Sequence, residues 1–188
     1  MNERASFDLA VKLRQEGAPL GEVYSFVSGL YFRGKMAYVN AFAAAPPGVP
    51  CSVVITPGFG LIPPETVVTI EQLRAIAAVP INLDDPRYRM PLERDARILN
   101  EAAGPGCQFV LLGSVATQKY MEPLLKIFGE RLVFPVDFAG RGDMSRGGLM
   151  LRCAHSGVEL TYAPAAVAKR HGPRPPKLPK WRPPEEAR

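Results

Sequence analysis

Three carboxylates stand in turns that follow apolar runs of strand length, which is where acid–base chemistry is expected in an open α/β sheet. Glu65 follows the run at 52–55, and Asp137 and Asp143 follow the run at 132–136. A carboxylate acts as a general acid or base when its surroundings raise its pKa or let it hydrogen-bond a leaving group. These three residues are therefore the candidate catalytic groups.

The same turns carry side chains suited to holding a ligand. Glycines allow the backbone to approach a ligand closely, Phe59 offers a planar face, and basic side chains near a helix entry attract phosphate or carboxylate groups. The candidate ligand-binding residues are Ser28, Tyr31, Arg33, Lys35, Gly58, Phe59, Gly60, Ser114, Lys119, Arg141 and Arg146. Each also has a purely structural interpretation, such as helix capping by Ser114, burial of Phe59 in a turn, or solvation of the arginines.

Known phosphate-binding and nucleophile fingerprints are missing from these turns. The dinucleotide pattern would need a glycine where Ser145 stands, and a P-loop would need a lysine after Gly147. Ser114 lacks the G-x-S-x-G elbow of a serine nucleophile. Hydrolysis by a Ser-His-Asp triad is therefore not expected.

Periodicity in the sequence predicts strands that alternate with helices. The expected strands are 22–27, 52–55, 108–112, 131–135 and 158–162. The expected helices are 8–15, 30–45, 69–78, 92–103, 115–128 and 144–155. This alternation indicates βαβ units, so we expect an α/β fold with three α/β/α layers, a mostly parallel sheet of four to five strands, and an extended C-terminal tail.

The excess positive charge lies entirely in that tail. The net charge is +5, and the seven basic and two acidic side chains of residues 169–188 account for all of it. The tail also holds six prolines and few apolar residues, which predicts an extended segment following a single domain at 1–168. The candidate nucleic-acid-binding residues are Lys169, Arg170, Arg174, Lys177, Lys180, Trp181 and Arg182.

Cysteines and histidines are too few and too scattered to suggest a metal centre. Cys51, Cys107 and Cys153 are far apart, and with only two histidines the chain has no pair of ligands at zinc-site spacing. The sequence suggests no cofactor. It also shows no secretory segment and no apolar run of the roughly 18 residues that a membrane span needs, so we expect a cytoplasmic protein without membrane contact.

Four short motifs, Phe26–Gly29, Leu30–Tyr38, Val54–Glu65 and Leu111–Leu124, resemble a set of largely uncharacterised bacterial domains. Those domains are similar to the core domain of archaeosine synthase, which has a uracil-DNA-glycosylase-like α/β fold. The resemblance spans about residues 22–140 and implies a nucleobase, nucleoside or modified nucleic acid as ligand. It carries over no catalytic residue, and the glycosylase fingerprints G-Q-D-P-Y-H and H-P-S-P-L-S are absent.

Two functional hypotheses follow from the sequence. In the first, the protein acts on a nucleobase, nucleoside or nucleic acid by base modification or glycosidic-bond chemistry, with the base stacked on Phe59 and Tyr31. In the second, the domain is not catalytic, and the basic tail binds nucleic acid through its cations and Trp181, or binds a protein partner through its prolines.

Overall fold

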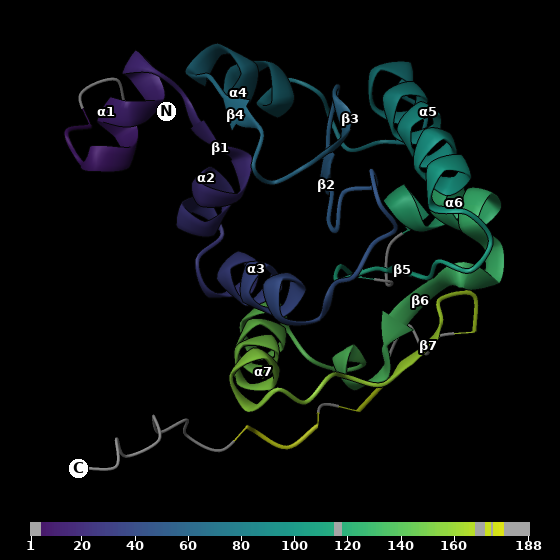
Figure 1. Cartoon of the computed structure of the whole chain (residues 1–188). Helices are drawn as coiled ribbons and strands as arrows, with labels where there is room; N and C mark the ends of the chain where they lie inside the picture. The colour runs from purple at the N-terminus through teal and green to yellow at the C-terminus, as the bar shows by residue number, and fades with distance from the viewer. Residues whose placement is uncertain (1–4, 115–117, 168–171, 174, 179–188) are drawn as a thin grey trace, which may run out of the picture.

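The computed structural model describes residues 5–114, 118–167, 172–173 and 175–178, which form a mixed α/β fold dominated by helices (Figure 1). Seven α-helices are described. They are α1 (Asp8–Gln15), α2 (Leu20–Val27), α3 (Leu30–Phe42), α4 (Ile70–Ala77), α5 (Pro86–Ala103), α6 (Gln118–Phe128) and α7 (Asp143–Ser156). Within the described residues, none of these helices combines the length and the apolar character that crossing a bilayer requires.

The strands are short and form three small sheets. They are β1 (Ala18–Pro19), β2 (Val54–Thr56), β3 (Gly60–Ile62), β4 (Val67–Val68), β5 (Phe109–Val110), β6 (Leu132–Pro135) and β7 (Tyr162–Pro164). β1 pairs with β4 and β2 with β3, both antiparallel, while β6 lies between parallel β5 and antiparallel β7. The predicted three-layer fold with a mostly parallel sheet of four to five strands is therefore wrong, and β5–β6 is the one parallel pair among the described strands.

The first predicted strand, 22–27, is a helix. Leu20, Val23 and Tyr24 recur at helical spacing, and all three contribute to one hydrophobic cluster. A short apolar run fits a buried strand and a helix face equally well, so periodicity alone could not separate the two. With α2 in place of a strand, the first predicted βαβ unit does not exist.

The second predicted strand turns back on itself instead of leading into a helix. Gly58 and Gly60 have φ angles of 81° and 79°, and the Phe59 N–H donates to the Thr56 carbonyl at 3.0 Å. This turn folds β3 antiparallel onto β2. Two glycines in the left-handed region thus convert the expected strand–helix crossover into a hairpin.

The β2–β3 hairpin lies between two hydrophobic clusters and contributes to both. One cluster is built from α1, β1, α2, β4 and α4, and the larger one from α3, α5, α6, α7 and the β5–β7 sheet. Val54 and Ile62 pack on the smaller cluster, whereas their neighbours Ile55 and Leu61 pack on the larger one. This alternation follows from the two-residue period of a strand.

Helices α3 and α7 cross with their backbones in contact, and this is the most extensive packing between any two described elements (Figure 1). A β-carbon on Gly34 would lie 2.5 Å from the Gly147 carbonyl oxygen, and one on Gly147 would lie 2.6 Å from the Leu30 carbonyl oxygen. Neither position has room for a side chain. The Gly-rich segment around Gly147, which the sequence suggested as a phosphate-binding turn, therefore serves helix packing.

The N-terminus of α4 carries a capping box whose loss should be measurable. The Thr69 hydroxyl accepts from the Gln72 N–H at 3.3 Å, and the Gln72 side chain accepts from the Thr69 N–H at 2.8 Å. We expect Thr69→Ala to lower the free energy of unfolding by about 1 kcal/mol, because a backbone donor loses its partner. Urea denaturation measures this change. Thr66→Ala, at an exposed position before the cap, is the control, and an equal loss in both variants would contradict a capping role.

Candidate functional site

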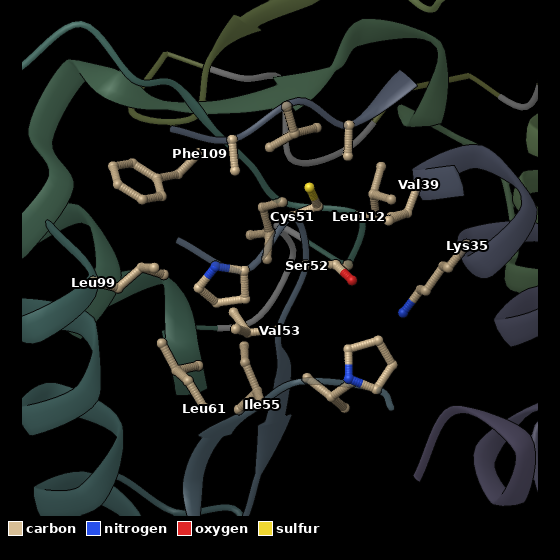
Figure 2. Close-up of a pocket in the computed structure, with 18 of the residues that line it drawn as sticks. Lys35, Val39, Cys51, Ser52, Val53, Ile55, Leu61, Leu99, Phe109 and Leu112 are labelled. Atoms are coloured by element: carbon tan, nitrogen blue, oxygen red, sulfur yellow. The ribbon is translucent and has the colours of Figure 1, made fainter. Parts of the chain in front are cut away.

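A cleft of about 1120 Å³ is lined mostly by residues of the larger hydrophobic cluster. α3, the segment at 49–55, the end of α5 and the strand end at 108–113 form its walls. Figure 2 shows Ile55, Leu61, Leu99 and Phe109 lining one part of this space, with Lys35 entering from the opposite side. Pockets of several hundred Å³ with apolar walls and a few polar groups are typical of small-molecule sites.

α3 supplies the polar side chains of one wall through a single face. Tyr31, Lys35 and Tyr38 lie four and three residues apart, so they project from the same side of the helix, and all three line the cleft. Arg33 lies off this face and is exposed. The periodicity of α3 thus selects which of its polar residues can meet a ligand.

Two tyrosine hydroxyls hydrogen-bond the backbone just after β5. The Tyr31 hydroxyl donates to the Leu112 carbonyl at 3.1 Å, and the Tyr120 hydroxyl accepts from the Ser114 N–H at 2.9 Å. Tyr120 interacts electrostatically with both Tyr31 and Tyr88, and all three side chains line the cleft. Burial raises the pKa of Tyr31 and of Tyr88 to about 12, so these two act as neutral hydrogen-bonding groups.

Tyr88 differs from its neighbours because its hydroxyl is unsatisfied. The side chain comes from the first turn of α5 and is 1% exposed, and its hydroxyl has no hydrogen-bond partner among the described residues. Tyr88 lines the cleft. A buried hydroxyl without a partner costs about 1–3 kcal/mol, and such groups are rare in folded proteins.

Lys35 places an ammonium group in a largely apolar part of the cleft. Its Nζ lies 4.2 Å from the centre of the Tyr31 ring and 5.8 Å from that of Phe32, and the described residues give it no hydrogen-bond acceptor. Burial lowers the pKa of Lys35 to about 8, and the nearby Arg146 acts in the same direction while Asp143 opposes it. Cation–π contact with Tyr31 offsets only part of the lost hydration.

Arg146 and Asp143 of α7 complete the charged surroundings of Lys35. The buried Arg146 guanidinium donates twice to the Phe138 carbonyl, at 3.2 Å each, and lies 3.7 Å from the Asp143 carboxylate. Arg146 is thus already satisfied by protein groups. Asp143 is largely exposed and influences Lys35 and Tyr31 through its charge.

A second chain of hydroxyls lines another part of the cleft. The Tyr38 and Tyr162 hydroxyl oxygens are 2.5 Å apart, Tyr162 donates to Glu159 at 2.7 Å, and the Leu160 N–H donates to Tyr38 at 2.9 Å. Burial and these contacts raise the pKa of Tyr162. Each of these two hydroxyls already has a protein partner. The hydrogen bonds therefore stabilise this wall of the cleft, whereas the Tyr88 hydroxyl has a bond to offer a ligand.

Comparison of the chain with protein-family models, curated proteins and solved structures found no significant match. The site is therefore interpreted from its own residues. Of the ligand-binding residues predicted from sequence, the structure places Ser28, Tyr31 and Lys35 in the cleft, with Ser114 and Arg146 bonded to or beside its tyrosines.

Other predicted ligand-binding residues lie elsewhere. Phe59 packs on the smaller hydrophobic cluster, so it offers no stacking face to the cleft. Gly60 is packed against Asp95 and the Pro91 carbonyl of α5, and Gly58 lies against Val79. Lys119 is exposed, and the Arg141 side chain donates locally to the Asp137 carbonyl at 2.9 Å and the Ser145 hydroxyl at 3.3 Å. The candidate ligand-binding residues therefore do not gather around one site.

The three predicted catalytic carboxylates do not converge. Glu65 is exposed and lines an adjoining cavity of about 750 Å³ next to Pro64 and Ser52. Asp137 is exposed in the turn after β6, and only Asp143 acts electrostatically on the cleft. Among the described residues, no three His, Cys, Asp or Glu side chains gather closely enough to hold a metal ion.

The tail residues Lys169, Arg170, Arg174, Lys180, Trp181 and Arg182 lie outside the described residues, and nucleic-acid binding by the tail stays a prediction. Lys177 is described and exposed. The described part of the tail rests on the protein: the Pro173 carbonyl packs against Gly140, and Leu178 lies beside Gly148 of α7.

Tyr88 and Tyr120 are site residues that the sequence prediction missed. We expected the helix of Tyr88 to begin at residue 92, which left this tyrosine in a loop. A signal was present, because Tyr88, Leu92 and Ala96 recur at four-residue spacing and Pro86 follows Asp85, which caps the helix.

Proposed function

We propose that the protein binds a nucleobase or nucleoside in the cleft along its larger hydrophobic cluster. The observation that carries this proposal is the buried hydroxyl of Tyr88, which has no hydrogen-bond partner among the described residues, in a cleft that Tyr120 also lines. Tyr88 has a proton to donate and lone pairs to accept with, and Tyr120 keeps its own proton after accepting from Ser114. The edge of a nucleobase presents acceptors and donors that match such a pair.

The remaining features of the cleft support the same ligand class. Its apolar walls and its volume of about 1120 Å³ suit a planar ring with an attached sugar. The motif resemblance to domains similar to the archaeosine synthase core supports a nucleobase on independent grounds. We propose binding, and no catalytic step, because Glu65 and Asp137 are outside the cleft.

Tyr88→Phe tests the proposal directly. Loss of one hydrogen bond is expected to weaken nucleoside binding about tenfold. The same substitution should raise the free energy of unfolding without ligand by about 1 kcal/mol, because it removes an unsatisfied buried group. Calorimetric titration with the common nucleobases and nucleosides measures the first effect, and urea denaturation the second.

Tyr120→Phe is the matched control for stability. Its hydroxyl accepts the Ser114 N–H, so we expect this variant to be less stable than the wild type, opposite to Tyr88→Phe. Absence of binding by any nucleobase or nucleoside at millimolar concentration would refute the proposed function. Unchanged binding together with lower stability in Tyr88→Phe would show that this hydroxyl has a structural role instead.

A further inference from the structure

We infer that Lys35 binds a phosphate group, so that the ligand of the cleft is a nucleoside monophosphate. This inference rests on the proposed function and extends it from a neutral base to an anionic nucleotide. The observation behind it is the ammonium group of Lys35, which enters the cleft without an acceptor among the described residues. Figure 2 shows this side chain extending toward the Cys51–Val53 side of the cleft.

The surroundings of Lys35 favour an anion from outside the protein. On α7, Arg146 donates to the Phe138 carbonyl and lies within 3.7 Å of Asp143, so Asp143 is already engaged by another cation. On α3, the Lys35 ammonium lies over the rings of Tyr31 and Phe32 and meets no carboxylate of the described part of the chain. Cys51, from the segment after α3, also lines this part of the cleft. A phosphate would supply the charge-assisted hydrogen bonds that the ammonium lacks.

Two serine hydroxyls that line the cleft also suit a phosphate ligand. Ser28 and Ser52 both line the cleft, and Figure 2 shows the Ser52 hydroxyl on the side that Lys35 enters. A phosphate monoester accepts several hydrogen bonds through its oxygens, which an ammonium and two hydroxyls can provide.

The two groups that carry the proposals set the orientation of the nucleotide. Lys35 lies over the Tyr31 ring, Tyr88 comes from the first turn of α5, and both residues line the cleft. We place the phosphate at Lys35 and the base at Tyr88.

The test compares each common ribonucleoside with its 5′-monophosphate by calorimetric titration at pH 7. We expect the monophosphate to bind wild-type protein at least tenfold more tightly than its nucleoside. Lys35→Met should abolish this gain, so that the variant binds the nucleoside and its monophosphate equally, and this remaining binding verifies that the cleft is intact. Lys126→Met, at an exposed position on α6, removes the same charge away from the cleft and should keep the gain.

A pH series on the wild type gives a second measurement that needs no variant. The gain from the phosphate should diminish as the pH rises from 7 to 9, because Lys35 loses its proton in this range. Equal affinity for nucleoside and monophosphate would overturn the inference and leave the proposed function standing. A gain that persists in Lys35→Met would also overturn it. Absence of binding by both ligands would refute the proposed function and the inference together.

Discussion

Replacing Gly147 by alanine is expected to lower the melting temperature by roughly 6–12 °C. The new methyl group would lie 2.6 Å from the Leu30 carbonyl oxygen and 2.8 Å from the Tyr31 Cα, so α3 and α7 must separate. Because the obstructing atoms belong to the backbone, no side chain can rotate away. Overpacking of this kind costs about 3 kcal/mol. For a chain of this size, each kcal/mol of lost stability lowers the melting temperature by about 2–4 °C.

Gly148 provides a matched control one residue along the same helix. A β-carbon there would lie 3.4 Å from the Arg152 guanidinium and 3.9 Å from Leu178, which are ordinary contacts with side chains. We expect Gly148→Ala to be neutral or to stabilise by up to about 1 kcal/mol, because alanine favours a helix over glycine. Differential scanning calorimetry compares the two variants. Equal melting temperatures would contradict the close crossing of α3 and α7.

Replacing Lys35 by methionine is expected to stabilise the protein without ligand by about 2 kcal/mol at pH 7. Methionine fills similar space without requiring a charge to lose its hydration, and the lowered pKa of Lys35, about 8 against 10.5 for a free lysine, reflects that cost. A substitution that raises stability and removes phosphate recognition is the expected pattern for a residue kept for binding.

The stability difference between Lys35→Met and the wild type should decrease as the pH rises. Below pH 8 both folded and unfolded states carry the protonated lysine, so the cost of burial is present in full. As the pH rises from 8 to 10.5, the folded state releases the proton while the unfolded state retains it, and the wild type gains stability. The advantage of Lys35→Met should therefore shrink across this range.

Urea denaturation at several pH values measures this difference, with Lys126→Met as the control. That residue is exposed on α6, so we expect little change in stability at any pH. Other groups that titrate in this range are common to the wild type and the variant and cancel in the comparison. A loss of stability in Lys35→Met at pH 7 would contradict the picture of a buried ammonium without an acceptor.

Helices with clear boundaries could be predicted from the sequence. The prediction of a helix at 8–15 is confirmed by α1 (Asp8–Gln15), and those at 30–45 and 69–78 are confirmed by α3 and α4 to within a few residues. In each case, glycine, proline or a capping residue next to the amphipathic stretch marks where the helix starts or stops. Such signals depend only on neighbouring residues, so they hold regardless of the tertiary packing.

The sheet could not be predicted because pairing partners are not a local property. Residues 52–55 were correctly expected to be extended, yet whether the chain continued into a helix or turned back depended on the backbone at Gly58 and Gly60. Both outcomes are compatible with T-P-G-F-G. The predicted alternation of strands and helices began with a strand at 22–27, where the structure has helix α2. Because each later strand was assumed to pair in parallel with its predecessor, this one local error changed the whole predicted sheet.

The residues that line the cleft were predicted where they share a helix face and missed where they depend on tertiary contacts. Tyr31 and Lys35 were found because they follow a strand-like run and could contact an anionic or aromatic ligand. The unsatisfied hydroxyl of Tyr88 appears only when α5 packs against the rest of the protein. Phe59 was misplaced because an aromatic residue in a glycine turn suits burial as well as stacking.

The β2–β3 hairpin joins the two hydrophobic clusters into one cooperative unit. Val54 and Ile62 are half-buried against one cluster while Ile55 and Leu61, one residue away on the same strands, are half-buried against the other. Neither half of the molecule can melt without uncovering the opposite face of this hairpin. A ligand seated against Ile55 and Leu61 would consequently protect amides in α1 and α4, helices outside the walls of its own site, from exchange with solvent.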